Sequence, residues 1–422
     1  KVFTSILMIN FTHSMNSLRR LLLFSLLFVF TLEAKEKPYV LLISFDGFRA
    51  DYLDWYDTPH FDRFAEHGVK ANGMKPVFVT STFPNHYSLA TGMYSENHGL
   101  IGNYFYDQKL DEYYKIRDRS KVEDARFYEG EPIWVTAENQ GVKSASFFWV
   151  GSEAPVGGEH PSIWKRYDQA VPFPARIDSV EKWFSLPSSR RPHLVMLYFH
   201  EPDGAGHRYG PKSAETEAMV DSMDTIMGMI VASMESLDIY PYLNIIVVAD
   251  HGMTTISSER TIDLSDYVNL SGIEQEGSGP YTMLYGQDKQ KLDQIIGQLK
   301  DVPHLKVYKK DEIPERYHYK NHYRIKDVLL IADEGWFILS KKYFGVDELN
   351  LKFLQGGAHG YDNELRSMHA IFLADGPAFK DGYSRPTLEN IHIYSLIAEI
   401  LGLTPNDKID GSLEKVQNVL KD

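Results

Sequence analysis

Three apolar segments of strand length are the feature that most constrains the fold of this chain. They are residues 39–45, 194–199 and 243–249. Runs that are apolar throughout are typical of strands buried on both faces, as in a parallel sheet. The acids that follow these runs are Asp46, Asp203 and Asp250. Because ligands of open α/β sheets gather at the carboxyl ends of the strands, these acids predict a site at one edge of a sheet.

Helical patterns alternate with the apolar runs. Residues 213–237 carry Met, Val and Ile at helical spacing, which we interpret as a buried stripe, and residues 390–401 have the pattern of an amphipathic helix. We therefore expect an α/β fold with a mostly parallel central sheet. A single catalytic domain over residues 35–422 is favoured, since neither internal repeats nor low-complexity linkers occur.

A small lobe is expected within this domain. Residues 289–305 and 328–339 show helix–strand patterns that are separate from the three apolar runs. We place the inserted lobe at about residues 260–350.

The N-terminal region has the composition of an export signal. Residues 1–14 precede Met15, and we interpret them as a non-native or overlong start. Residues 15–34 combine a basic beginning, an apolar core and a small-residue ending, which is typical of a signal peptide. The apolar core is too short for a membrane span. We expect a periplasmic or secreted protein without a span after cleavage; an uncleaved anchor is the alternative.

The composition narrows the chemistry of any site. The chain has 58 acidic and 44 basic side chains, a formal net charge of -14, and no cysteine. The acidic balance argues against a stable nucleic-acid complex, because a polyphosphate would be repelled. Without thiolates, any zinc must be held by histidines and carboxylates, the ligand set of hydrolytic zinc sites.

Histidines accompany the strand-end acids. Asp203 and His207 are four residues apart, so a helical turn would place them on one face. Asp250 and His251 are adjacent, and His359 lies among glycines, where backbone approaches a ligand closely. Each feature alone also fits an exposed pair or a solvated turn. Together, three Asp and three His provide two nitrogen–oxygen sites, the composition that two-metal phosphoryl chemistry needs.

A hydroxyl at a helix start is the candidate nucleophile. We expect Thr82 to be the N-cap of a helix that ends before Gly92. A helix N-terminus suits a phosphate, and a metal-bound hydroxyl there can ionise and attack phosphorus. Asn103 follows a glycine-containing turn and can donate its amide to a phosphoryl oxygen. The alternatives are a simple capping threonine and a turn asparagine.

Several motifs together resemble the nucleotide pyrophosphatase/phosphodiesterase family of the alkaline phosphatase superfamily. In order, between about residues 38 and 365, they are ISFDGFRADYL, TFPNHYSLATGMYSENHGLIGN, GEPIWV, FFWVGSE, EPDGAGHRYGP, VVADHGM and GAHGYDN. This resemblance implies an alkaline-phosphatase-like three-layer sandwich with a small inserted lobe. It also implies two zinc ions. One would be bound by Asp203, His207 and His359. The other would be bound by Asp46, Asp250, His251 and Thr82.

The resemblance also implies roles in substrate binding. Asn103 would stabilise the transition-state oxygens, Phe83 and Tyr167 match positions that stack on a nucleoside base, and Tyr198 matches another pocket aromatic. Two residues depart from the family pattern. Ser81 stands where a lysine often precedes the nucleophile, and His200 stands where the vertebrate relatives tend to have an acid. Both bear on substrate preference.

The resemblance implies hydrolysis of nucleotide phosphodiester and pyrophosphate bonds through a covalent threonyl intermediate, with release of nucleoside 5'-monophosphates. The alternative is a phospholipid-type phosphodiesterase, acting on choline or glycerol esters, at the same metals. A phosphomonoesterase is disfavoured because no arginine stands beside Thr82 to bind a dianionic phosphate. A sulfatase in its usual form is excluded by the missing C/S-x-P-x-R motif. A non-catalytic metal or nucleotide binder is a further reading.

Overall fold

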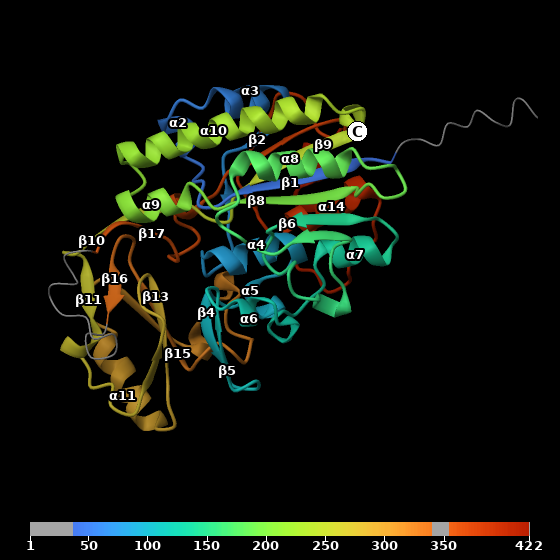
Figure 1. Ribbon diagram of the computed structural model, residues 1–422. Helices are drawn as coiled ribbons and strands as arrows, with labels where there is room; N and C mark the ends of the chain where they lie inside the picture. Colours follow the sequence, from blue (N-terminus) through green and yellow to red (C-terminus); the bar gives the residue numbers. More distant parts are fainter. Residues whose placement is uncertain (1–36, 340–353, 422) are drawn as a thin grey trace, which may run out of the picture. The chain divides into compact units, whose positions relative to one another are not determined.

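The computed structural model describes residues 37–339 and 354–421 (Figure 1). Its main element is an eight-stranded sheet with the order β19-β2-β18-β9-β1-β8-β6-β7. The strands are β1 (Tyr39–Phe45), β2 (Val69–Ala71), β6 (Ser144–Phe147), β7 (Ile163–Lys165), β8 (Leu194–Phe199), β9 (Leu243–Val248), β18 (Phe372–Asp375) and β19 (Tyr383–Arg385). Every pairing is parallel except those of β18 with β9 and β2.

The three apolar runs form the neighbouring strands β9, β1 and β8 at the middle of this sheet. All their residues are buried, as expected for strands that are covered on both faces. The mostly parallel central sheet is therefore confirmed.

Helices form a layer on each face of the sheet (Figure 1). One layer contains α3 (Pro59–His67), α8 (Phe173–Phe184) and α10 (Ala214–Glu235). The other contains α4 (Thr82–Thr91), α7 (Ile133–Asn139) and α14 (His392–Leu401). The helices α10 and α14 confirm the two amphipathic patterns. The Ser213 hydroxyl accepts from Thr216 N and caps α10, whose Val220, Met223 and Met227 are buried.

Short elements connect these layers. The remaining helices of the main part are α2 (Tyr52–Trp55), α5 (Ser95–His98), α6 (Arg119–Val122) and α9 (Asp203–Tyr209). The small strand pairs are β20 (Leu388–Glu389) with β3 (Met74–Lys75), β4 (Tyr104–Asp107) with β5 (Glu112–Lys115), β10 (Thr254–Ser257) with β17 (Gln355–Ala358), and β11 (Thr261–Asp263) with β16 (Phe337–Leu339).

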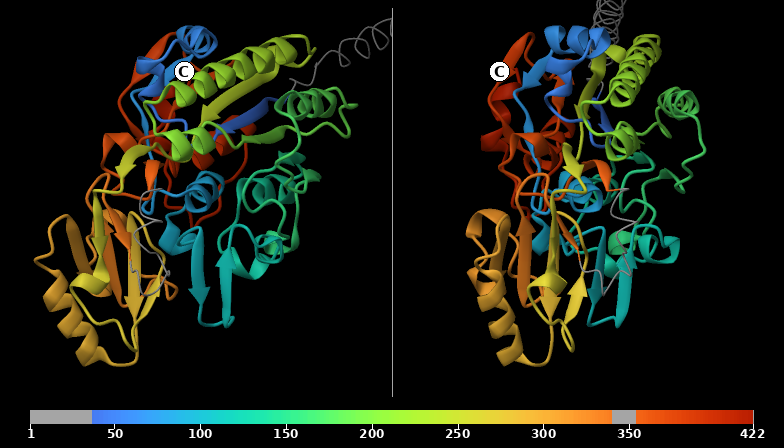
Figure 2. Two further views of the ribbon diagram at one scale, coloured as in Figure 1. Left: turned by 60° about the vertical axis from the view of Figure 1, so that its left-hand side comes forward. Right: turned by 90° about the vertical axis from the view of Figure 1, so that its left-hand side faces the viewer.

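A second hydrophobic core lies between residues 256 and 368. It includes the antiparallel sheet of β12 (Glu274–Glu276), β13 (Tyr281–Tyr285), β15 (Val328–Ala332) and β14 (Leu305–Lys309), and the helix α11 (Lys289–Leu299). Figure 2 shows these elements as one group in yellow and orange. The pattern over residues 289–305 gives a helix followed by a strand. The helix expected in residues 328–339 is wrong, because the β-branched and aliphatic run 328–332 pairs with β13 and β14 as a strand.

The limits of the lobe, about 260–350, stay a prediction. Part of that range, and the proposed signal segment 15–34, lie outside the described residues. Among the described helices, none combines the length and the apolar character that a membrane span requires.

Candidate active site

The three predicted acids meet at the carboxyl ends of β1, β8 and β9. Asp46 N donates to Phe199 O at 2.9 Å, and Asp203 N donates to Asp46 O at 3.0 Å. The backbone N–H of Gly47 donates to Asp250 Oδ1 at 3.0 Å. Gly47 has a φ of 67°, and a Cβ there would lie 2.9 Å from Asp203 Cα, so only glycine allows the acids this close approach.

Asp203, His207 and His359 form one group of candidate metal ligands. Helix α9 begins at Asp203, so His207 lies one turn later on the same face, as predicted. Nδ1 of His207 lies 2.9 Å from Gly357 O, and Nδ1 of His359 lies 2.8 Å from Thr80 O. Each Nδ1–H therefore donates to a carbonyl, which leaves both Nε2 atoms as acceptors, 3.0 Å apart. Asp203 Oδ1 lies 3.4 Å from His207 Nε2.

Asp46, Asp250 and His251 form a second, fully buried group. His251 Nδ1 lies 2.9 Å from Gly252 O, so its Nε2 faces the acids. That Nε2 lies 3.0 Å from Asp250 Oδ2 and 3.6 Å from Asp46 Oδ1. The ring of His251 stacks on His359 with centroids 3.5 Å apart, so the two groups adjoin.

Orphaned carboxylate oxygens show that these groups fit cations. One oxygen in each of three acids is buried without a hydrogen-bond partner among the described residues: Asp46 Oδ1, Asp203 Oδ1 and Asp250 Oδ2. Burial, with the neighbouring charges of Asp250 and Asp203, raises the pKa of Asp46 well above its ordinary value. Buried carboxylates without partners are costly unless a cation compensates them. Nitrogen and oxygen donors of this kind suit zinc and related divalent metals.

Thr82 lies beside the second group. Its Oγ1 is 3.3 Å from His251 Nε2. The expected N-cap is displaced by one residue: Ser81 is extended (φ -126°, ψ 156°) and is the N-cap, whereas Thr82 is already helical. The helix ends at Gly92 in the left-handed region, as predicted. Asn103 Oδ1 accepts from Phe83 N at 2.9 Å, so the side chain of Asn103 is fixed at this helix N-terminus. Its Nδ2 has two N–H donors.

A pocket of about 330 Å³ opens at this point. Its lining residues are Asp46, Thr82, Phe83, Ile116, Arg117, Arg119, Val122, Phe148, Val150, Glu153, Tyr167, Gln169, Tyr198, His200, Glu201, Asp203 and Gly204. The Tyr198 hydroxyl donates to Asp46 Oδ2 at 2.6 Å, and its ring centroid is 6.3 Å from that of Tyr167. The predicted aromatics therefore form a wall that leads away from the acids.

His86 is a residue of the site that sequence reasoning missed. It is fully buried, and burial lowers its pKa. Its Nε2 lies 2.8 Å from Ser44 Oγ, its Nδ1 lies 2.9 Å from Thr82 O, and the same Nδ1 is 3.4 Å from Asp250 Oδ2. His86 thus links the helix start to a candidate ligand. The signal was present, because His86 stands four residues after Thr82, on the same helical face.

Arg119 and Glu153 were also missed as site residues, although both line the pocket. They form an ion pair, and Glu153 Oε2 also accepts from Tyr167 N at 2.8 Å. The FFWVGSE motif contains Glu153, but its contact with a residue 34 positions earlier is not visible in the sequence.

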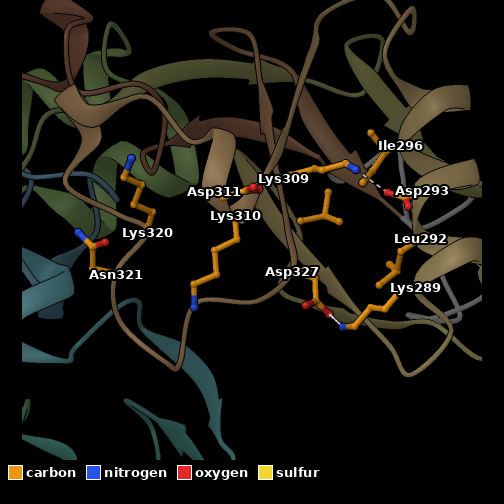
Figure 3. A pocket seen from close by; sticks show the side chains of 11 residues that line it. Lys289, Leu292, Asp293, Ile296, Lys309, Lys310, Asp311, Lys320, Asn321 and Asp327 are labelled. Atoms are coloured by element: carbon orange, nitrogen blue, oxygen red, sulfur yellow. Dashed lines mark hydrogen bonds and ion pairs between the residues drawn. The ribbon is translucent and has the colours of Figure 1, made fainter.

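A larger pocket, about 510 Å³, belongs to the second core (Figure 3). Its lining lysines alternate with aspartates. Lys289 Nζ lies 2.7 Å from Asp327 Oδ2, and Lys309 Nζ lies 2.6 Å from Asp293 Oδ1. None of the predicted site residues lines this pocket. Because Lys289 and Lys309 are paired with aspartates of the lining and Lys320 is paired with Glu315, most of the positive charge at this pocket is already neutralised.

The mostly parallel sheet, with two Asp/His groups at its carboxyl edge and the Thr82 hydroxyl at the start of α4, defines an alkaline-phosphatase-like fold. The profile of the type I phosphodiesterase/nucleotide pyrophosphatase family matches residues 40–362, and the chain belongs to this family. The predicted fold class and family are thereby confirmed.

Relatives of known structure or activity are similar over most of this chain. A venom phosphodiesterase from Naja atra is 38% identical over 394 residues, which are 90% of this chain and 46% of that protein. A bis(5'-adenosyl)-triphosphatase from Mus musculus is 38% identical over 390 residues, 91% of this chain and 82% of that protein. The chain thus spans about half the length of the venom relatives.

The solved structures include murine ectonucleotide pyrophosphatase/phosphodiesterase 5, as an inactive threonine-to-alanine variant in complex with AMP. It superposes with a TM-score of 0.85 at 35% identity, covering 91% of this chain and 100% of that one. The human counterpart matches with the same TM-score and identity.

Proposed function

We propose that this chain hydrolyses nucleotide phosphodiester and pyrophosphate bonds and releases nucleoside 5'-monophosphates. The observation that carries the proposal is the position of the Thr82 hydroxyl, at the start of α4, beside His251 and within a pocket that has an aromatic wall. The relatives agree with it, since they include a venom phosphodiesterase, a bis(5'-adenosyl)-triphosphatase and a neighbour bound to AMP.

We infer that two zinc ions are the metals. Asp203, His207 and His359 would hold one of them. Asp46, Asp250, His251 and Thr82 would hold the other. The lack of cysteine leaves histidine and carboxylate as the donors, and the orphaned oxygens call for cations. When bound, the two cations supply the positive charge that lowers the pKa of an alcohol and offsets charge on phosphoryl oxygens.

The residues of the chain itself would carry two displacements. Thr82 Oγ1 forms a bond to phosphorus while the bond to the leaving group breaks, which gives a covalent threonyl intermediate whose phosphorus still carries the nucleoside ester. Water then forms the new bond to phosphorus, the Thr82 bond breaks, and its hydroxyl regains a proton. The positive end of the α4 helix dipole and the amide of Asn103 stabilise charge on the phosphoryl oxygens. Phe83 and Tyr167 provide stacking faces for the base.

Replacement of the hydroxyl tests the nucleophile. We expect Thr82→Ala to keep its zinc and to lose kcat by on the order of a thousandfold or more, because the group that bonds to phosphorus is gone. Thr82→Ser should retain measurable turnover. The assay is hydrolysis of p-nitrophenyl thymidine 5'-monophosphate, with elemental analysis for zinc. The exposed Thr255→Ala is the matched control. Full turnover in Thr82→Ala would refute the assignment.

The same assay separates the two substrate classes. Wild-type protein should hydrolyse the thymidine ester faster than p-nitrophenylphosphocholine. Faster turnover of the choline ester would instead favour the phospholipid-type alternative.

We also infer that the chain acts outside the cytoplasm, in the periplasm or as a secreted protein. The composition of residues 15–34 supports this, as does the similarity to venom phosphodiesterases. Detection of the mature protein in a periplasmic or culture-medium fraction is the corresponding test.

A further inference from the structure

Arg119 lies at the far end of the aromatic wall. The wall begins at Asp46, which accepts a hydrogen bond from Tyr198, and continues through Tyr198 to Tyr167. The guanidinium carbon of Arg119 is 5.9 Å from the centroid of the Tyr167 ring. Because the guanidinium lies over that ring, a base that stacks on Tyr167, with its phosphate at Thr82, would lie beside Arg119.

The guanidinium of Arg119 is held in place by acids. Glu153, which is 6% exposed, forms an ion pair with Arg119 Nη2 and also accepts from the backbone N–H of Tyr167. A second acid, Glu123, lies 3.5 Å from the same Nη2. One carboxylate thus fixes both the arginine and the segment that carries the stacking tyrosine. Such preorganisation lowers the entropy lost when a ligand binds.

The guanidinium of Arg119 is partly open to the pocket. The side chain is 30% exposed and lines the pocket, whereas its Nε is buried and has no hydrogen-bond partner among the described residues. Arginine donates and never accepts. A ligand atom that binds the exposed part of this guanidinium must therefore be an acceptor.

We infer that Arg119, positioned by Glu153, binds the substrate by donating to an acceptor on the edge of the nucleobase. The inference rests on the proposed function. Carbonyl oxygens, as in thymine, uracil and guanine, are the acceptors that a guanidinium binds best. Glu153 is a positioning residue that acts through Arg119 and Tyr167.

A comparison of two esters tests this role. p-Nitrophenyl thymidine 5'-monophosphate carries a base with two carbonyl groups, whereas bis(p-nitrophenyl) phosphate has no base. In Arg119→Gln, the ratio of kcat/KM for the thymidine ester to that for the base-free ester should fall about tenfold, chiefly through KM. Glu153→Gln should lower the same ratio by a smaller factor, because the amide oxygen still accepts from Tyr167 N while the arginine is no longer held. Arg119→Lys should restore part of the ratio.

The control is Arg126→Gln, an exposed arginine paired with Asp124 and Glu112, which should leave the ratio as in the wild type. A purely structural role for Arg119 would depress both esters equally, and an unchanged ratio in Arg119→Gln would overturn the inference. Failure of the proposed function has a different signature. The wild-type protein itself would then show no preference for the thymidine ester over the base-free one.

Discussion

The hydroxyl of Tyr198 orients the carboxylate of Asp46, a candidate metal ligand. It donates to Oδ2 of Asp46, whose other oxygen, Oδ1, has no partner among the described residues. The bond therefore fixes which oxygen of the carboxylate is presented to His251 and Asp250. Residues that orient a metal ligand in this way commonly change metal affinity when they are replaced.

Tyr198→Phe removes this hydroxyl with little change in shape. We expect zinc affinity at the second group to fall by about 10- to 100-fold, because Asp46 loses its orienting bond. Zinc retention against a graded chelator series is the measurement. Tyr394→Phe is a matched control, since that hydroxyl bonds to Thr136 Oγ1 at 2.7 Å instead. Equal retention in the two variants would show that the bond does not orient Asp46.

The candidate ligands could be predicted at this scale because local pattern and motif both point to them. Asp203 and His207 share a helical face, and Asp250 with His251 follows an apolar run. The supporting residues could not be predicted in the same way. His86 and Glu153 act through partners that lie 42 and 34 positions away in the chain, Ser44 and Arg119, and such pairings are set by tertiary packing.

Arg324 connects several elements within the described chain. Its fully buried guanidinium donates to Asp107 Oδ2 of β4 at 2.6 Å, to Gly99 O at 2.7 Å and to Phe127 O at 2.8 Å. Burial acts to raise the pKa of Asp107. Hydrogen bonds from Tyr323, from the Leu110 backbone and from Arg324 outweigh burial and lower that pKa to about 2. The side chain of Arg324 thus connects the hairpin of β4 and β5, which follows Asn103, to the backbone at Gly99 and Phe127.

Arg324→Leu should destabilise the fold by about 3–5 kcal/mol, because it leaves the buried Asp107 carboxylate without its cation. Urea unfolding is the measurement, and the exposed Arg126→Leu should cause a much smaller change. A carboxyl group whose pKa is lower in the folded state than in the unfolded state stabilises the fold at the pH values where it is ionised. In the wild type this contribution is complete above the ordinary pKa of 3.8 and is lost as the pH falls through about 2. Equal stability of the two variants at pH 7 would contradict this account.

Long elements with a clear period were predictable, and short ones were not. The continuous apolar runs of β1, β8 and β9 and the periodicity of α10 predicted these elements, and the structure shows the three strands buried. Residues 328–332 were ambiguous, because a short apolar run fits a buried helix as well as a strand. Its pairing with β13 on one side and β14 on the other decided the outcome. The N-cap at Ser81 differed from the expectation by one residue, which is the usual uncertainty of a helix end.

For the whole molecule, the two ligand groups predict a link between metal and stability. Chelation should abolish turnover and lower the midpoint of thermal unfolding by on the order of 5 °C, because cations that bind only the folded state stabilise it. Returning zinc should restore both. Differential scanning calorimetry with and without chelator measures the shift.

In Asp250→Asn the chelator-induced shift should shrink, since one of the two groups is impaired. If the chelator changed neither the thermal midpoint nor the turnover, the two Asp/His groups would not bind metals as proposed.

The positions in the sequence of the residues that line the pocket have an evolutionary consequence. More than half of the residues that line the pocket come from one stretch, residues 116–169, and this stretch contains none of the candidate metal ligands. Much of the pocket wall, although not Phe83 or Tyr198, therefore comes from a part of the chain that is separate from the candidate metal ligands. Exchange of that single stretch between relatives would therefore replace much of the pocket wall and leave the candidate metal ligands in place.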